Sequence, residues 1–261
     1  MKFSRRVLKE FLKSEPPHLA MIRSIEAEYY KKYLPLKGKI LDVGCGDGIF
    51  AWSVFKRQKI DLGVDVDNSL WKEAKNRKNY LKVVNYDGKK LPVKSETFDT
   101  VICNCVLEHV IKPEKLVAEM MRVTKVGGIF LATVVGKDFG DSFVGTKILG
   151  QKYKNWFNRK SIHVSCKSRR EWKKLFENEG YKVLKLETYF NYKGAGEFFE
   201  LTHYWGIINL VSRKLTGRWS KGIAFTSNKI WEKLAIFLMK GMKNKTNKEP
   251  YFMVVAEKIK T

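Results

Sequence analysis

Three glycines at alternate positions follow a short apolar run in residues 39–50, which read KILDVGCGDGIF. Glycine gives no side chain to a core and loses the most backbone entropy on folding, so stability does not explain Gly44, Gly46 and Gly48. Such a loop can turn sharply and let a ligand approach the main chain, with a helix N-terminus behind it. The spacing favours a site for a nucleotide-like ligand. The alternative is a tight strand-to-helix turn that binds nothing.

The glycine spacing also discriminates between nucleotides. The dinucleotide fingerprint G-x-G-x-x-G needs glycine at position 49, where this chain has Ile49. The phosphate-binding pattern G-x-x-x-x-G-K-[ST] does not occur in the sequence. We therefore predict that nicotinamide dinucleotides do not bind specifically.

The next expected strand after the glycine motif ends with a carboxylate. Asp65 stands in GVDVD, at the end of an expected strand over 60–66. A carboxylate in this place can accept hydrogen bonds from both hydroxyl groups of a ribose. The alternative is a cap for the next helix, a role that Asp67 or Asn68 can also fill.

Two further carboxylates lie at strand ends. Asp87 precedes Gly88 after the run 80–87, where it can accept a hydrogen bond from an exocyclic amine or form an ordinary Asp-Gly turn. Asp42 precedes the glycines at the end of the first expected strand, where it can face a cationic ligand or organise the loop.

Strand and helix patterns alternate along the chain and must position these residues. Strands are expected over 39–43, 60–66, 80–87, 97–104, 129–135, 181–189 and 251–259, and helices over 49–58, 68–78, 113–125 and 168–180. This alternation predicts an α/β fold, a doubly wound, Rossmann-like and mostly parallel sheet with helices on both faces. In such sheets ligands bind outside the carboxyl ends of the strands.

The net charge of +24 is concentrated in the second half of the chain. Residues 136–261 hold 26 Lys or Arg and 11 Asp or Glu, whereas residues 40–135 hold 15 and 12. An excess of this size suits an acidic partner such as anionic lipid, a phosphorylated substrate or nucleic acid. The alternative is a lysine-rich proteome, as heat adaptation produces.

The cysteine content and the apolar runs indicate a cytoplasmic protein. None of the four cysteines forms a C-x-x-C pair, so we expect reduced thiols and neither a metal site nor disulfides. The basic N-terminal stretch has no continuous apolar core, unlike a secretory signal. No run approaches the roughly 18 apolar residues of a membrane-spanning helix.

Four segments together resemble the class I S-adenosylmethionine-dependent methyltransferases: ILDVGCGDG, GVDVD, YDGKKLPVKSETFDTVICNCVLEHV and EMMRVTKVGGIFLAT. Within that class they are similar to the group that contains the ubiquinone, menaquinone and small-molecule methyltransferases, over roughly residues 36–190. The resemblance implies a seven-stranded sheet whose last strand, 251–259, is antiparallel. Val126 stands where the group usually has proline, which affects a turn.

The resemblance also implies a binding site for S-adenosylmethionine. Its expected residues lie in the glycine loop and at the ends of the next strands: Asp42, Gly44, Cys45, Gly46, Asp65, Val66, Asp87, Gly88 and Asn104. Asp42, Gly44 and Gly46 would lie near the methionine moiety, Asp65 near the ribose and Asp87 near the adenine.

Two histidines are candidate catalytic residues. A hydroxyl that accepts a methyl group benefits from a general base, and histidine is the commonest one. His109 in VLEHV follows the fourth strand, and His163 in RKSIHVS lies in a loop ahead of the sixth. The alternative for each is a histidine packed for structure, and His18 and His203 have weaker claims.

Two regions lie outside the expected core of residues 36–190 and its last strand, 251–261. Residues 1–35 are expected to form a helical lid, and residues 191–250 a helical insertion or cap. In the insertion one helical face is expected to carry Trp231, Leu234, Leu238 and Met242, with lysines elsewhere. That face suits either the core of a cap or peripheral contact with an anionic membrane.

These observations predict a methyltransferase that acts on a small-molecule, lipid-linked or saccharide acceptor, by O-methylation. An RNA-directed enzyme is the first alternative, since the charge suits it. It is disfavoured because the fourth strand ends in NCVLEHV instead of [ND]PP[YF], and because no Pro-Cys dipeptide or RNA-binding module is recognisable. The second alternative is a non-enzymatic protein that binds the cofactor and keeps the fold.

Overall fold

The computed structural model describes residues 2–13, 15–56, 58–67, 70–204 and 232–259. The chain divides into two compact units. We call Tyr30–Phe139, Asn158–Tyr189 and Glu249–Thr261 the sheet unit, and Met1–Tyr29, Gly140–Phe157 and Phe190–Lys248 the helical unit. Residues 140–157 fall in the span that the sequence assigned to the core, yet they belong to the helical unit.

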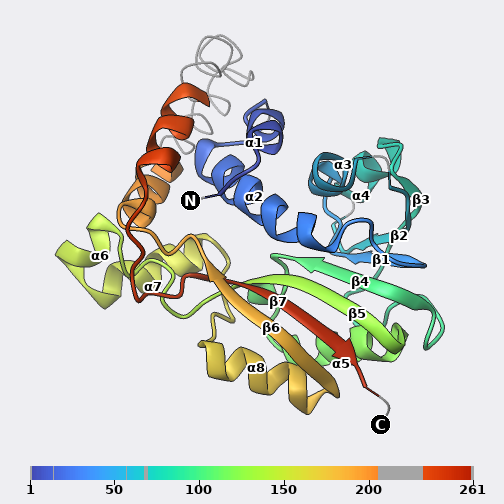
Figure 1. Ribbon diagram of the computed structural model, residues 1–261. Coiled ribbons are helices and arrows are strands. Elements are labelled where there is room, and N and C mark those ends of the chain that lie inside the picture. Colours follow the sequence, from blue (N-terminus) through green and yellow to red (C-terminus); the bar gives the residue numbers. More distant parts are fainter. Residues whose placement is uncertain (1, 14, 57, 68–69, 205–231, 260–261) are drawn as a thin grey trace. The chain divides into compact units, whose positions relative to one another are not determined.

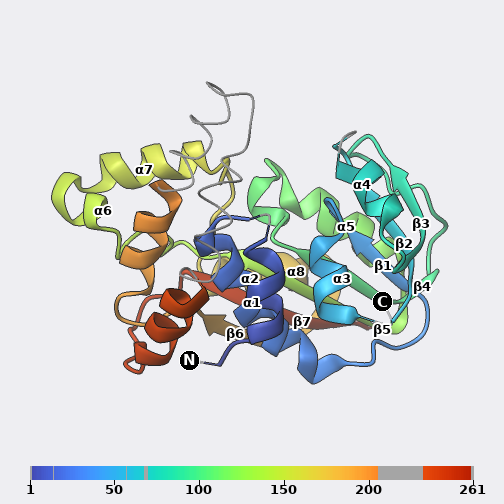
Figure 2. The ribbon, with the colours of Figure 1, turned by 90° about the horizontal axis from the view of Figure 1, so that it is seen from above.

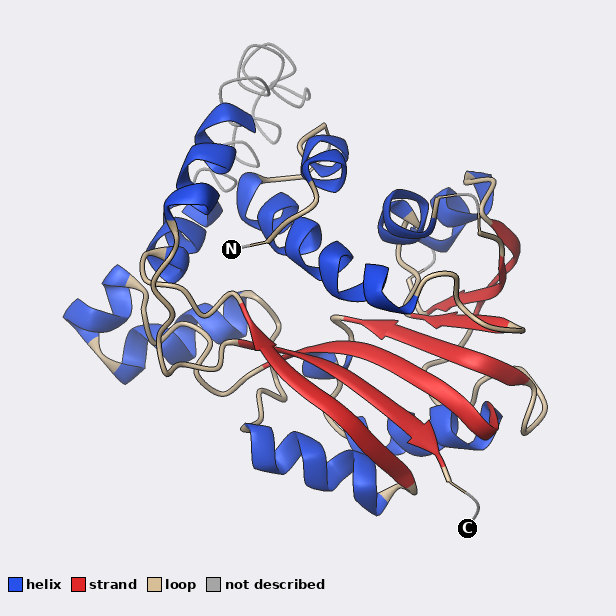
Figure 3. Ribbon diagram, in the orientation of Figure 1, coloured by secondary structure: helices blue, strands red, loops and turns tan. Residues whose placement is uncertain are grey.

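The sheet unit is built on seven strands in the order β3-β2-β1-β4-β5-β7-β6 (Figures 1 and 3). The strands are β1 Ile40–Val43, β2 Ile60–Asp65, β3 Tyr80–Asn85, β4 Phe98–Asn104, β5 Thr124–Val135, β6 Tyr181–Tyr189 and β7 Tyr251–Lys258. β7 runs antiparallel to both β5 and β6, and the other neighbours pair in parallel. The predicted Rossmann-like sheet with an antiparallel last strand is therefore confirmed.

Helices cover both faces of this sheet. They are α3 Ile49–Phe55, α4 Leu70–Asn76, α5 Pro113–Val123 and α8 Arg169–Asn178. Figure 3 shows α3 and α4 on one face and α5 and α8 on the other. α8 begins with a capping box between Ser168 and Glu171 and buries Trp172, whose indole N–H donates to the carbonyl oxygen of Val135 at 3.0 Å.

The start of β5 differs from the sequence prediction. We expected the helix to continue to residue 125 and the strand to begin after the Gly127–Gly128 pair. Instead the helix ends at Val123, and the strand begins at Thr124 because this residue pairs with Phe98 of β4. The register of the β4–β5 pair shifts just after this point, and that irregularity accommodates the two glycines within the strand.

A buried lysine closes the C-terminal end of α5. The Lys258 ammonium donates to the carbonyl oxygens of Met121 at 3.1 Å and Thr124 at 2.9 Å, and it lies 3.2 Å from a carboxylate oxygen of Glu96. Met121 lies in the last turn of α5, where carbonyl groups have no partner inside the helix, and Thr124 is the first residue of β5. The lysine therefore supplies a charged donor to buried carbonyls at the junction of the two elements.

Replacing Lys258 with methionine is expected to lower the free energy of unfolding by about 2–4 kcal/mol, because buried carbonyls would lose charged donors. Urea denaturation measures the change. Lys182→Met, at an exposed position of β6, is the matched control and should change stability by less than about 0.5 kcal/mol. Equal effects of the two substitutions would contradict the capping role.

The helical unit contains the two expected N-terminal helices, α1 Arg5–Phe11 and α2 Pro17–Tyr30, although α2 reaches one residue into the sheet unit. It also contains helical residues 195–204 and 232–241. α6 Val144–Leu149 and most of α7 Gln151–Lys160 complete it, and the sequence patterns did not predict these two helices (Figures 1 and 2). Among the described residues, no helix combines the length and apolar character needed to cross a membrane.

The buried face of helix 232–241 differs from the one expected. Of the predicted face, Met242 is buried, Leu238 is half-buried and Leu234 is 37% exposed, whereas Ala235 and Met239, which were not predicted, are buried. The apolar face is thus rotated by about one residue from the predicted one, and it packs as a core. Trp231, which was assigned to the predicted face, lies outside the described residues.

Candidate functional site

The three glycines after β1 all adopt the left-handed backbone region, with φ of 75°, 54° and 75° for Gly44, Gly46 and Gly48. A Cβ atom on Gly44 would lie 2.3 Å from a methyl carbon of Val106, so that glycine is required by packing inside the unit. At Gly46 the corresponding position has no heavy atom of the described residues within 4 Å. The loop is therefore open to a ligand at Gly46.

Asp65 connects the end of β2 to this loop. Its carboxylate accepts the Gly46 N–H at 2.8 Å on one oxygen and the Asp67 N–H at 2.9 Å on the other, and the side chain is buried. Each carboxylate oxygen has a second acceptor site, so two hydroxyl groups could still bind. Asp67 caps α4 through Leu70 N–H at 3.2 Å; the other proposed cap, Asn68, lies outside the described residues.

Val66 and Gly88 lie side by side after β2 and β3. A Cβ atom on Gly88 would be 3.4 Å from a methyl group of Val66, whose side chain is 57% exposed. Asp87 is exposed and accepts the N–H groups of Lys89 at 2.9 Å and Lys90 at 3.4 Å. The Lys89 N–H holds the pKa of Asp87 below its usual range. Asp87 thus forms a turn, and its contact with a base remains a prediction.

Asp42 is buried and bound to a residue that the sequence reasoning missed. The hydroxyl of Tyr80, at the start of β3, donates to the Asp42 carboxylate at 2.6 Å. The tyrosine ring reaches across β2 at Gly63, where a Cβ atom would lie only 2.8 Å from it. Gly63 is the direct neighbour of Asp42 in the sheet. The only sequence signal was a glycine inside a strand, which can mark a close approach of other groups.

Burial changes the ionisation of this group of residues. It raises the pKa of Asp42 to about 6, although the hydrogen bond from Tyr80 acts in the opposite direction, and nearby Asp65 raises it further. Burial likewise raises the pKa of the Cys45 thiol, which the carboxylates of Asp42 and Asp65 also disfavour as a thiolate. Cys45 is therefore a neutral packing residue in the loop.

We expect Asp42 to make stability fall as pH rises. Below about pH 4 the carboxyl is protonated in both states, whereas between about pH 4 and 6 the unfolded chain loses its proton first. The free energy of unfolding should therefore drop by about 3 kcal/mol across this range, and the Asp42→Asn protein should not show this drop. Urea denaturation of both proteins at pH 4 and 7 measures it. A difference between them that is independent of pH would contradict the shifted pKa.

The end of β4 is tied both to β5 and to the glycine loop. Asn104 accepts a hydrogen bond from the Thr133 hydroxyl at 2.7 Å, and the Cys105 N–H donates to the Thr133 carbonyl oxygen at 3.0 Å. Val106 then packs against Gly44. Asn104 therefore holds the strand end in place beside the loop, and its contact with a cofactor remains a prediction.

The structure brings the two candidate histidines together. His109 ends a short 3₁₀ helix, η2 Leu107–His109, and its ring centroid lies 5.3 Å from that of His163. The loop that carries His163 is fastened to η2, because the N–H groups of Val164 and Ser165 donate to the Glu108 carbonyl oxygen at 2.8 and 3.0 Å. His163 also packs edge-on against Phe139, at 4.8 Å between centroids.

A backbone carbonyl determines the tautomer of His109. Its Nδ1 lies 3.0 Å from the carbonyl oxygen of Ile162. Because a carbonyl oxygen can only accept, we infer that Nδ1 carries the proton and Nε2 the lone pair in the neutral ring. This is the tautomer that a general base needs when Nε2 meets the substrate.

Exposed apolar side chains flank the histidine pair. Ile111 follows η2, and Ile162 and Val164 stand on either side of His163 in the chain. All three side chains are more than half exposed. Apolar side chains that are open to contact therefore lie next to both histidines in the chain.

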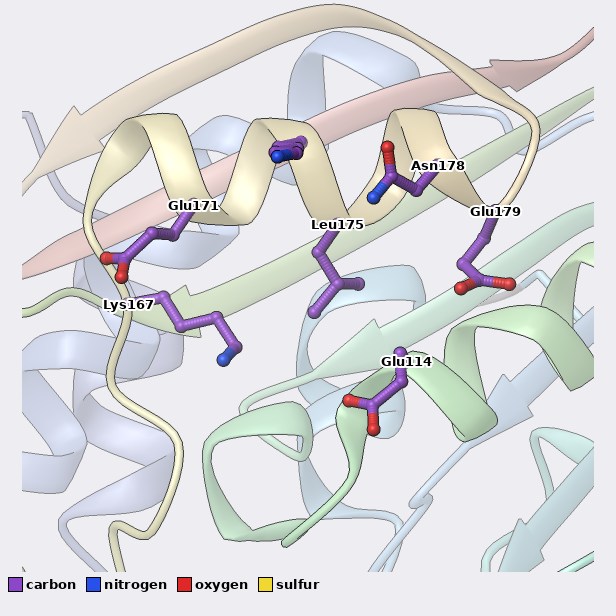
Figure 4. A pocket seen from close by; sticks show the side chains of 7 residues that line it. Glu114, Lys167, Glu171, Leu175, Asn178 and Glu179 are labelled. Carbon is purple, nitrogen blue, oxygen red and sulfur yellow. The ribbon is translucent and has the colours of Figure 1, made fainter.

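A hollow of about 220 Å³ lies elsewhere on the sheet unit, between α5 and α8 (Figure 4). Its lining mixes both signs of charge: Glu114, Lys167, Glu171, Lys174, Leu175, Asn178 and Glu179. It shares no residue with the glycine loop or the histidine pair. In the parts of the chain that the structure describes, no cluster of His, Cys, Asp and Glu side chains could hold a metal ion.

Comparisons with known proteins find a methyltransferase domain within the sheet unit. A family model described as a methyltransferase domain matches residues 41–132. A protein of Methanocaldococcus jannaschii, named as uncharacterized, is 33% identical over 165 residues, which are 63% of this chain and 74% of that protein. A ubiquinone biosynthesis O-methyltransferase of Coxiella burnetii is 31% identical over 132 residues, 49% of this chain and 56% of its own length. The chain thus spans just over half of that relative.

A solved structure extends the similarity over nearly the whole chain. It is a methyltransferase of Thermotoga maritima, described as S-adenosylmethionine-dependent and a possible histamine N-methyltransferase. The TM-score is 0.58 at 19% identity, and the match covers 95% of this chain and 92% of the other. At this identity the likeness concerns the fold alone.

Proposed function

Because the chain belongs to the class I S-adenosylmethionine-dependent methyltransferases, we propose that it methylates a hydroxyl oxygen on an apolar small-molecule or lipid-linked acceptor. His109 acts as the general base. The observation that carries the proposal is the Ile162 carbonyl at 3.0 Å from His109 Nδ1, together with the apolar side chains around this histidine.

The residues after β1, β2 and β3 fit the cofactor. The open position at Gly46 leaves room for a ligand against the main chain, and Asp65, held by two backbone amides, can accept the ribose hydroxyls. Val66 against Gly88 offers an apolar shelf for the adenine ring. When bound, the cofactor supplies a methyl group on a positively charged sulfur, and the carbon–sulfur bond breaks as the carbon–oxygen bond forms.

The protein's own contribution is to orient the acceptor and take its proton. The acceptor hydroxyl donates to His109 Nε2, which removes the proton as the oxygen attacks. The Ile162 carbonyl keeps the ring in place and stabilises the imidazolium that forms, because it continues to accept the Nδ1 proton. Positioning of reacting groups at near-contact distance can account for about 7–11 kcal/mol of a barrier in favourable cases.

The surroundings of the histidines support an apolar acceptor. Ile111, Ile162 and Val164 would cover an aromatic ring or an alkyl chain placed beside His109. An RNA base would instead call for stacking aromatic side chains and a basic channel. The similarity to a ubiquinone biosynthesis O-methyltransferase supports oxygen as the methylated atom.

Transfer of labelled methyl groups to a panel of acceptors tests the proposal. The panel contains catechols with and without a long alkyl chain, a saccharide, an amine and transfer RNA. We expect methylation of catechol oxygen, with a lower KM for the alkylated compound. Methylation of RNA alone would favour the alternative that the net charge of +24 suggests. Binding of S-adenosylhomocysteine without any transfer would favour a non-enzymatic role.

A further inference from the structure

α6 in the helical unit displays its apolar side chains outward. Every residue of this helix is at least partly exposed, and Val144, Ile148 and Leu149 are 48%, 74% and 64% exposed. Apolar residues that serve a core are buried, as Met239 and Met242 are in the same unit. The apolar residues of α6 therefore do not contribute to a core.

The helix is nevertheless held firmly. The buried Glu200 carboxylate accepts the N–H of Val144 at 2.5 Å and that of Gly145 at 3.0 Å, and it also accepts the Tyr153 hydroxyl. The ring of Tyr153 occupies the space beside Gly145, where a Cβ atom would lie 2.2 Å from it. These contacts anchor the first turn, so the exposed apolar side chains project from a helix that is fixed within the unit.

The charge around α6 is positive. Residues 140–157 hold three lysines and one acidic residue, Asp141, which pairs with Lys154. Lys147 and Lys152 are exposed, and Lys147 pairs with Glu197 at 2.6 Å. In the sequence of the whole helical unit, 20 residues are Lys or Arg and 8 are Asp or Glu. A partner of complementary charge is therefore anionic.

We propose that α6 is a peripheral membrane-docking element that inserts Val144, Ile148 and Leu149 into an anionic bilayer. The exposed lysines Lys147 and Lys152, in α6 and just after it, would contact the lipid headgroups at the same time. A six-residue helix is too small to form a standard protein–protein interface, which involves about 20–30 residues on each side. Shallow insertion beside basic residues requires no more than such a helix provides. The proposal does not depend on methyl transfer or on its acceptor.

Co-sedimentation of the full chain with lipid vesicles tests this role. Vesicles of phosphatidylcholine alone are compared with vesicles that contain about one third phosphatidylglycerol, at 0.1 and 0.5 M salt. We expect binding to the anionic vesicles only, and it should weaken at the higher salt. Ile148→Asp/Leu149→Asp should weaken it at least tenfold, and Lys152→Glu about fivefold.

Leu81→Asp is the matched control, because Leu81 is a 65% exposed leucine on β3 of the sheet unit. It should bind vesicles like the unaltered protein. Calorimetry with S-adenosylhomocysteine and light scattering check that each variant is folded and report its oligomeric state. The proposal is overturned if the unaltered protein binds no vesicles, or if the α6 variant binds anionic vesicles as well as the control does. It is also overturned if the α6 variant instead dissociates a dimer, which would identify a second copy of the chain as the occupant.

Discussion

Replacing His109 with glutamine is expected to lower the rate of methyl transfer about 10²–10⁴-fold, the range that a general base contributes. Glutamine can still donate to the Ile162 carbonyl but has no basic nitrogen for the acceptor proton. Single-turnover transfer to the preferred acceptor measures the change. Affinity for S-adenosylhomocysteine, measured by calorimetry, should stay within about twofold, since the substitution does not alter the glycine loop.

His163→Gln distinguishes the base from its neighbour. His163 packs against Phe139, and its ring centroid lies 5.3 Å from that of His109, so we expect it to position the His109 ring. Its replacement should lower the rate of methyl transfer about tenfold. Equal losses in the two variants would mean that the histidines act as one unit. A His109→Gln protein that retains more than a tenth of its activity would remove the general base from the mechanism.

Replacing Asp65 with asparagine is expected to weaken binding of S-adenosylhomocysteine about 30–150-fold. The change removes the charge from a carboxylate that is positioned to accept ribose hydroxyls, and it replaces one of the two oxygens that accept backbone N–H groups with an NH₂ group. A hydrogen bond to a charged group contributes about 1.5–3 kcal/mol. Calorimetry on the folded protein gives the affinity directly. The effect should be on cofactor binding, with the acceptor KM changed much less.

Asp61→Asn is the matched control for that substitution. Asp61 belongs to the same strand, but at its other end, where it accepts the N–H of Ile40 at 2.8 Å. Asparagine can keep that hydrogen bond through its carbonyl oxygen, so affinity should not change. If both variants lose affinity equally, the loss reflects general destabilisation, and Asp65 has no special part in the site.

The order of strands and helices was predictable because it depends on local patterns. Apolar runs, glycines after strands and the Pro113 start of α5 are visible in short windows of sequence, and each is confirmed by the structure. The start of β5 was not predictable, since it depends on the pairing of Thr124 with Phe98, a residue 26 positions away. Pairing partners of this kind are decided by the path of the chain.

The sequence by itself also supplied the candidate cofactor residues, through the motifs that resemble the methyltransferases. Each residue lies at or just after the end of a parallel strand, and those strand ends meet at one edge of the sheet. It identified His109 and His163 as separate candidates. Only the tertiary structure joined them, through two hydrogen bonds from the loop after α7 to the Glu108 carbonyl oxygen of η2. The contact between Tyr80 and Asp42 also depends on the fold. The Tyr80 ring can reach Asp42 because Gly63, which lies between them, has no side chain.

The exposure of the apolar side chains of α6 was also decided by the tertiary structure. A helix of six residues is too short for the periodicity of its sequence to indicate which side chains are buried. The residue type alone does not tell whether an apolar side chain faces a core or the solvent. Its exposure follows from the anchoring of its first turn by Glu200, a residue more than 50 positions later in the chain. Local sequence thus determined the strands of the sheet and the helices that cover it, but not α6 and α7. Contacts between distant residues decided what those elements present, because burial depends on the surrounding atoms and not on the residue alone.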